Sequence, residues 1–148
     1  MEYLELSVPT KPYIKRYMEN TYSDPIYLTR RENPGSLLFL LLERSPHEND
    51  KRVGAYSVTM KITLSSKFYH RKGAALSPTS LTIFNNFLEE NIKNIMQAYI
   101  KALMENKVTD KKAKAINTFL EKNSFPPDTF PFETIKKHLY RYEKSIKN

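Results

Sequence analysis

The sequence predicts an α+β fold with a small N-terminal sheet and short helices, a long spine helix, and a C-terminal unit resembling a helix-turn-helix. Three observations predict it. Residues 55–65 alternate between apolar and polar side chains, which is typical of a half-buried strand. Residues 77–106 carry apolar side chains at helical spacing. Residues 107–148 hold two amphipathic segments separated by a proline-rich turn.

The N-terminal part begins with an alternating segment, residues 3–8, that predicts a first strand. A short helix is expected from Pro12 to about Asn20, with Thr10 as its N-cap and proline in its first turn. After a turn at residues 23–25, residues 26–29 predict a second short strand.

The apolar run from Leu37 to Leu42 fits either a buried strand or a short buried helix. Its leucine content, and Ser36 as a possible cap, favour a helix that ends near Arg44. The next strand is predicted over residues 55–65, where the apolar positions are Tyr56, Val58, Met60, Ile62 and Leu64.

The long helix is expected to start with Ser77 as N-cap and Pro78 in the first turn, and to end near Asn106. Its predicted apolar stripe would form a core or a dimer seam. The stripe consists of Phe84, Phe87, Leu88, Ile92, Ile95, Tyr99, Ile100 and Leu103. The positions expected to face away are Asn86, Glu89, Glu90, Lys93, Gln97 and Lys101.

Two further helices are predicted after Asn106. The first is capped by Thr109 and ends near Lys122, and the second covers residues 132–145. The sequence therefore predicts two domains, an α+β core with the long helix over residues 1–106 and a basic two-helix unit over residues 107–148.

The charge balance favours a polyanionic partner. The chain has 24 basic and 16 acidic side chains, which give a net charge of +8, and residues 107–148 alone contain 10 and 5. There is no cysteine, and no apolar run is long enough to cross a bilayer. We expect a soluble, cytoplasmic protein with nucleic acid as its partner, DNA before RNA, and no membrane association.

The helix predicted at the C-terminal end carries the first candidate site. Its inward face would hold Ile135, Leu139, Tyr142 and Ile146, which leaves a basic face on the opposite side. Lysine and arginine there would contact phosphates, and Arg141 could also contact guanine. An ordinary solvated helix face is the alternative. The candidate residues are Lys136, Lys137, Tyr140, Arg141 and Lys144.

A second candidate site follows the strand predicted over residues 55–65. Arg71 and Lys72 lie in a basic connection that also contains Phe68 and Tyr69. Such a connection could act as an arm along a nucleic-acid backbone. An exposed loop without a partner is again the alternative.

Catalytic chemistry is not expected. The three histidines share no metal-ligand spacing, and no phosphate-binding glycine loop or nucleophile motif occurs. The spacing of His138 and Arg141 matches the H-x-x-R of tyrosine recombinases, but the other arginine boxes and a downstream nucleophile are missing. No enzyme activity, metal or cofactor is predicted.

Residues 115–120, residues 132–142 and the tyrosine-rich start at residues 8–23 carry a resemblance. Together they resemble small DNA-associated proteins of bacterial mobile elements and prophages. The resemblance implies a DNA-associated role in transcriptional regulation or element maintenance, and it implies no catalytic residue. Two features depart from it, the three prolines at 126, 127 and 131, and Ser23 where glycine is expected.

Two functions remain open. One is sequence-specific or semi-specific DNA binding without catalysis, as a dimer in which the long helix provides the seam. The other is an adaptor role, in which the apolar stripe of the long helix binds another protein. RNA binding through the sheet is disfavoured, because the strand at residues 55–65 exposes Ser57, Thr59, Lys61 and Thr63 in place of aromatics.

Overall fold

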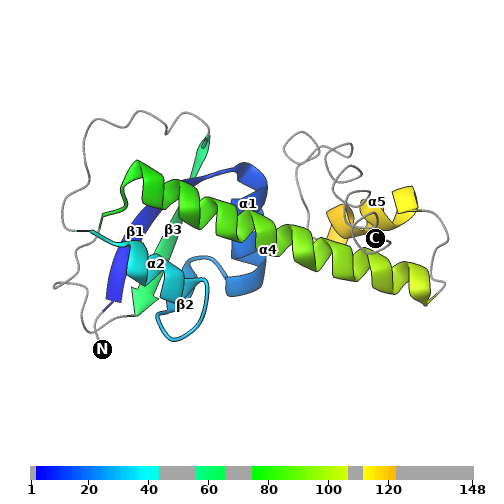
Figure 1. The fold of residues 1–148 in the computed structure, drawn as a ribbon, viewed down its shortest axis with the longest axis horizontal. Coiled ribbons are helices and arrows are strands. Elements are labelled where there is room, and N and C mark those ends of the chain that lie inside the picture. Colours follow the sequence, from blue (N-terminus) through cyan, green and yellow to red (C-terminus); the bar gives the residue numbers. More distant parts are fainter. Residues whose placement is uncertain (1–2, 44–55, 66–74, 107–111, 123–148) are drawn as a thin grey trace, which may run out of the picture. The chain divides into compact units, whose positions relative to one another are not determined.

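The computed structural model describes residues 3–43, 56–65, 75–106 and 112–122. In these ranges the α+β prediction is confirmed (Figure 1). Contacts group the chain into two units, Met1–Glu89 and Glu90–Asn148, and the division falls inside the long helix. The boundary expected after residue 106 stays a prediction.

The first unit contains a three-stranded sheet. Strand β1 (Tyr3–Thr10) pairs antiparallel with β3 (Val58–Ser65), and β2 (Ile26–Thr29) pairs parallel with the other edge of β3. The order is therefore β1-β3-β2, with β3 in the centre. The strand with the clearest alternation in the sequence thus contributes to both ladders.

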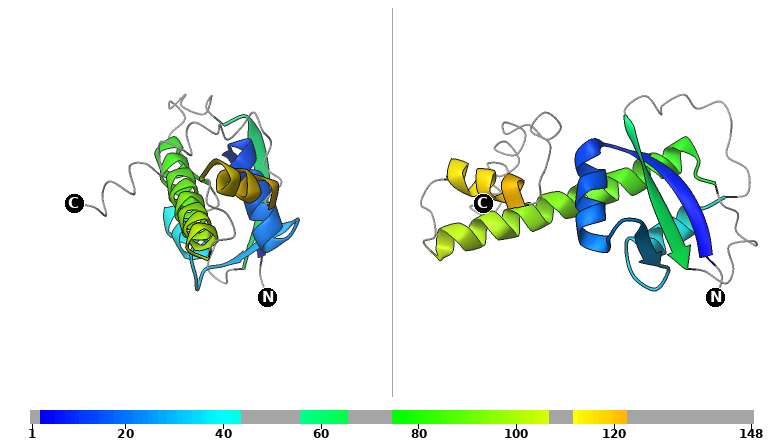
Figure 2. Two further views of the ribbon diagram at one scale, coloured as in Figure 1. Left: turned by 90° about the vertical axis from the view of Figure 1, so that its right-hand side faces the viewer. Right: turned by 180° about the vertical axis from the view of Figure 1, so that it is seen from behind.

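One face of this sheet is buried and the other is open to solvent. The register places Leu6 beside Ile62, and Ile62 beside Ile26, so one apolar row crosses all three strands. In the rear view of Figure 2, strands β1 and β3 lie in front of the first turns of helix α4 (Pro78–Glu105). The residues that pack beneath the sheet include Tyr13, Ile14 and Met18 of α1, Leu38 of α2, and Leu81 and Phe84 of α4.

Helix α1 (Pro12–Tyr22) has the predicted proline in its first turn, but the prediction of Thr10 as its cap is wrong. The N-cap is Lys11, which makes no side-chain capping bond. Thr10 is instead the last residue of β1, and its fully buried hydroxyl donates to Asn85 Oδ1 at 2.6 Å. The Thr10 hydroxyl therefore bonds a residue 75 positions away and does not cap the neighbouring helix α1.

Helix α1 is followed by Ser23, whose φ of 73° and ψ of 174° lie in a region that glycine adopts far more readily than other residues. The Ser23 hydroxyl donates to the carbonyl of Pro25 at 3.1 Å, a local bond that partly offsets the strain.

The leucine run does form a helix, α2 (Gly35–Leu41), as predicted. It starts earlier than expected, with Pro34 in place of Ser36 as N-cap, and ends before Glu43. A Cβ at Gly35 would overlap the carbonyl of Thr29, so only glycine lets the helix approach β2 this closely. Glu43 forms a short antiparallel bridge with Ala75.

Helix α4 starts as predicted, because the Ser77 hydroxyl accepts a bond of 3.1 Å from the amide of Ser80. Its buried face differs from the predicted stripe at several positions. Ile95 is 46 % exposed, and Gln97, expected to face away, is buried. Met96, absent from the predicted stripe, is fully buried and fills the position between Ile92 and Ile100.

The second unit, Glu90–Asn148, is described in the C-terminal part of α4 and in helix α5 (Lys112–Lys122). Its described core contains Ile92, Met96, Ile100, Ile116 and Phe119. The rings of Tyr99 and Phe119 lie 5.7 Å apart at 54°, and Lys122 Nζ lies 4.7 Å from the centre of the Tyr99 ring. The apolar side of α5 therefore faces this core.

Candidate functional site

The residues predicted to contact nucleic acid lie outside the described residues. This applies to the proposed basic helix face and to the basic connection after β3. The residues concerned are Lys136, Lys137, Tyr140, Arg141, Lys144, Arg71 and Lys72. The helix predicted over residues 132–145 and the cap at Thr109 also lie outside these ranges.

The distribution of charge separates two parts of the sequence. Residues 1–106 contain 14 basic and 11 acidic side chains, a net charge of +3. Residues 107–148 contain 10 and 5, a net charge of +5. More than half of the positive surplus therefore belongs to residues 107–148.

A polar tie joins β1 to α4 inside the first unit. Besides accepting from Thr10, Asn85 donates through Nδ2 to the carbonyl of Pro9 at 3.0 Å and to that of Leu81 at 3.1 Å. Lys11 and Glu89 form a salt bridge of 3.1 Å beside it. All groups of this tie have partners within the fold, so it positions β1 and gives no sign of chemistry.

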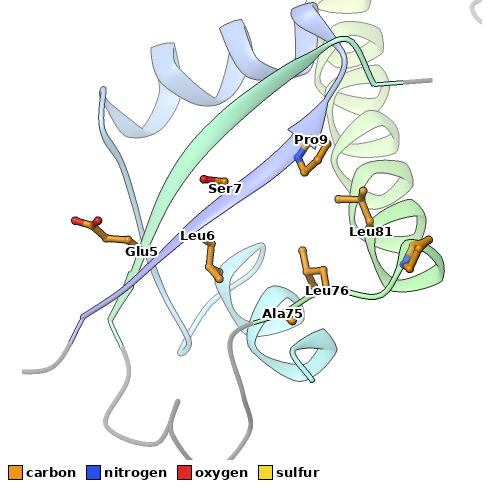
Figure 3. Close-up of a pocket in the computed structure, with 8 residues that line it drawn as sticks. Glu5, Leu6, Ser7, Pro9, Ala75, Leu76 and Leu81 are labelled. Atoms are coloured by element: carbon orange, nitrogen blue, oxygen red, sulfur yellow. The ribbon is translucent and has the colours of Figure 1, made fainter. Parts of the chain in front are cut away.

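A groove lies along the outer edge of β1 (Figure 3). Its volume is about 280 Å³. Leu6 points from the strand toward Ala75 and Leu76, whereas Glu5 and Ser7 point to the opposite side. The lining residues are Glu5, Leu6, Ser7, Pro9, Ala75, Leu76, Pro78 and Leu81. Sequence reasoning missed this groove, because no local pattern tells which strand has a free edge.

The open face of the sheet carries two exposed tyrosines. Tyr3 on β1 is 52 % exposed and Tyr27 on β2 is 56 % exposed, and Lys61 of β3 lies on the same face. The expectation that the strand at residues 55–65 exposes no aromatics agrees with β3, and the exposed tyrosines of this face come from the two flanking strands. Glu5 lies on the face as well, so its described charges are balanced.

The described residues give no sign of an activated nucleophile or a metal centre. Burial raises the pKa of the Tyr22 phenol, and the nearby Tyr17 and Glu32 raise it further. This direction keeps the phenol neutral, whereas a phenolate nucleophile needs a lowered pKa. Within the described ranges, no group of three or more His, Asp or Glu side chains is placed to hold a metal ion.

No protein-family model, no curated protein and no solved structure matches this chain. In the part of the chain that the structure describes, no helix is both long enough and apolar enough to span a bilayer.

Proposed function

We propose that the protein is a non-enzymatic nucleic-acid-binding protein that contacts double-stranded DNA through its basic segments, above all within residues 107–148. The observation that carries this proposal is the uneven charge, because residues 107–148 have a net charge of +5 and the much longer range 1–106 has +3. Phosphate contacts are made by such clustered lysines and arginines, and they supply most of the affinity of non-specific binding.

Within those segments, the predicted helix over residues 132–145 is the strongest candidate. Lys137 and Arg141 are four residues apart, so a helix would place them on one face. Both side chains could then contact phosphates of the same stretch of the DNA backbone. A cytoplasmic regulator or mobile-element accessory factor that acts as a dimer is the finer form of this proposal.

The test is a fluorescence anisotropy titration of a labelled mixed-sequence duplex at low and at physiological salt. We expect micromolar or tighter binding that weakens as salt rises. Lys137→Ala with Arg141→Ala should weaken it without lowering the melting temperature. The matched control, Lys15→Ala with Arg16→Ala, removes the same charge from α1 and should change binding much less. Equal losses in both double variants would contradict the assignment to the last helix.

The alternative function is an adaptor that binds a protein through the apolar stripe of α4. Most of this stripe is not exposed for such binding. Phe84, Leu88, Ile92 and Ile100 of the stripe are buried inside the chain. The exposed apolar residues that remain on α4 include Ile83 and Ile95, both 46 % exposed. Their separation of twelve positions corresponds to about 120° around a helix, so they do not form one face.

A further inference from the structure

Backbone groups on the outer edge of β1 have no hydrogen-bond partner among the described residues. In an antiparallel pair, successive residues of a strand direct their N–H and C=O groups alternately toward the partner and away from it. Pro9 has no N–H to donate to β3, and its carbonyl accepts from Asn85, so we assign Pro9 to the outward set. Glu5 and Ser7 lie four and two positions before Pro9 and belong to the same set.

No described residue bonds the outward N–H or C=O of Glu5 or Ser7. One end of the edge is closed, because Asn85 occupies the Pro9 carbonyl and proline has no N–H. The open stretch therefore covers two donors and two acceptors in an extended array. Only an extended polypeptide matches such an array along its whole length.

The opposite wall of the groove does not compete for these groups. Ala75 exchanges both of its backbone bonds with Glu43, at 2.7 and 3.0 Å. Leu76 and Leu81 offer apolar side chains to the groove together with Leu6 of β1. A strand added to β1 would direct every second side chain into this apolar pocket.

The other face of an added strand would meet Glu5. This carboxylate is exposed and has no ion-pair partner among the described residues, and its neighbour across the β1–β3 ladder is the uncharged Thr63. A lysine or arginine opposite Glu5 would form a favourable cross-strand pair. A second copy of β1 fits less well, because it carries a glutamate and no basic residue.

We infer that the β1 edge is a binding site for an extended peptide segment of a partner protein, which pairs antiparallel with β1 and in which an apolar residue precedes a basic one. The basic residue pairs with Glu5 on the open face, and the apolar residue enters the pocket between Leu6, Leu76 and Leu81. This inference is independent of nucleic-acid binding.

The test uses the full-length ¹⁵N-labelled protein and the peptide acetyl-Thr-Val-Lys-Val-Thr-amide, followed by amide NMR shifts and hydrogen exchange. Antiparallel pairing of its lysine with Glu5 places the preceding valine opposite Leu6 and the first threonine opposite Ser7. We expect saturable binding with a dissociation constant on the order of 100 µM, because the contact is short. The amides of Glu5 and Ser7 should shift and gain protection. Those of Leu4, Leu6 and Val8, which already bond β3, should change little.

Two peptide controls separate the contributions. Methylation of the lysine amide nitrogen removes one ladder donor and should abolish binding. Replacing the lysine by glutamate should weaken binding about two- to fivefold. Shifts confined to residues outside β1 would overturn the site, and so would the same Glu5 and Ser7 shifts with a short single-stranded oligonucleotide.

Two protein variants complete the design. Ser7→Pro removes an outward donor but no bond to β3, so it should abolish peptide binding, with Ser7→Thr as the matched control. Glu5→Lys keeps the backbone and reverses the charge, so it should prefer the glutamate peptide by about two- to fivefold. Peptide affinity unchanged in Glu5→Lys, or in a folded Ser7→Pro, would contradict the inference.

Discussion

The two units of the chain differ in how they are held together and in where their charge lies. In Met1–Glu89, residues 75 positions apart share a buried hydrogen bond, and a three-stranded sheet joins segments from across the unit. In Glu90–Asn148, the described contacts join two helices that are neighbours in sequence. The first unit has 12 basic and 9 acidic side chains, a net charge of +3, and the shorter second unit has 12 and 7, a net charge of +5. Contacts between residues far apart in sequence therefore stabilise the first unit, whereas the second unit carries the larger net charge on fewer residues.

The largest effects should come from truncating one core phenylalanine in each unit. Phe84→Ala and Phe119→Ala each remove a ring that is at most 2 % exposed, so each should lower the free energy of unfolding by about 3–5 kcal/mol. Urea denaturation measures the loss, and amide exchange locates it. We expect Phe84→Ala to expose the β3 amides and Phe119→Ala to expose those of α5. Loss of protection across both units in both variants would contradict the expectation that each unit is stabilised by its own core.

The non-local polar tie should give the next largest effect. Asn85→Ala leaves the buried hydroxyl of Thr10 and the carbonyl of Pro9 without their partner, which should cost about 1–3 kcal/mol. The neighbouring Asn86 is exposed, and Asn86→Ala should change stability by less than about 0.5 kcal/mol. Chemical denaturation of the two variants side by side measures this difference. Equal stabilities would show that the tie contributes nothing.

A substitution at the end of α1 should increase stability. Ser23→Gly relieves the unfavourable backbone at φ 73° and loses one exposed hydrogen bond to Pro25. The relief of strain outweighs the loss of an exposed bond, so we expect a gain of about 1 kcal/mol. Ser23→Ala keeps the strain and loses the bond, so thermal melting of the two variants separates the two effects. A lower melting temperature for Ser23→Gly than for Ser23→Ala would refute the prediction.

The smallest effect should come from the cation over an aromatic ring in the second unit. Lys122→Ala removes the ammonium 4.7 Å from the centre of the Tyr99 ring and should cost about 0.5–1 kcal/mol. Glu121→Ala, at the adjacent exposed position, serves as the control and should be nearly neutral. Denaturation at low and high salt measures the free energy of unfolding. A loss of stability in the control as large as in Lys122→Ala would show that the contact between Lys122 and Tyr99 does not stabilise the fold.

The sequence predicts the elements of this fold well where the pattern is local. Alternation identifies β1 and β3, and the pair Ser77 and Pro78 identifies the start of α4. It fails where a residue has a partner far along the chain. Thr10 looks like a helix cap until Asn85 is placed beside it, and the free edge of β1 follows from the strand order alone. The buried Gln97 carries no local signal that separates it from its exposed neighbours.

The two candidate sites differ in whether the sequence alone reveals them. The clustered charge of Lys136, Lys137, Arg141 and Lys144 is visible in the sequence, because charge needs no fold to be counted. The peptide groove needs β1, Ala75 and Leu81 to be brought together, and their separation in sequence hides it.

The proposed nucleic-acid affinity resides in the basic residues 107–148 and not in helix α1. The most direct measurement is the slope of the logarithm of the DNA association constant against the logarithm of the salt concentration, for the full chain and two double variants. Lys137→Ala with Arg141→Ala should reduce the magnitude of the slope by about 2, because each lost phosphate contact releases about one fewer counterion. Lys15→Ala with Arg16→Ala should leave the slope unchanged. A slope reduced in the second variant but not in the first, or no salt-dependent binding by the folded wild-type protein, would contradict the claim.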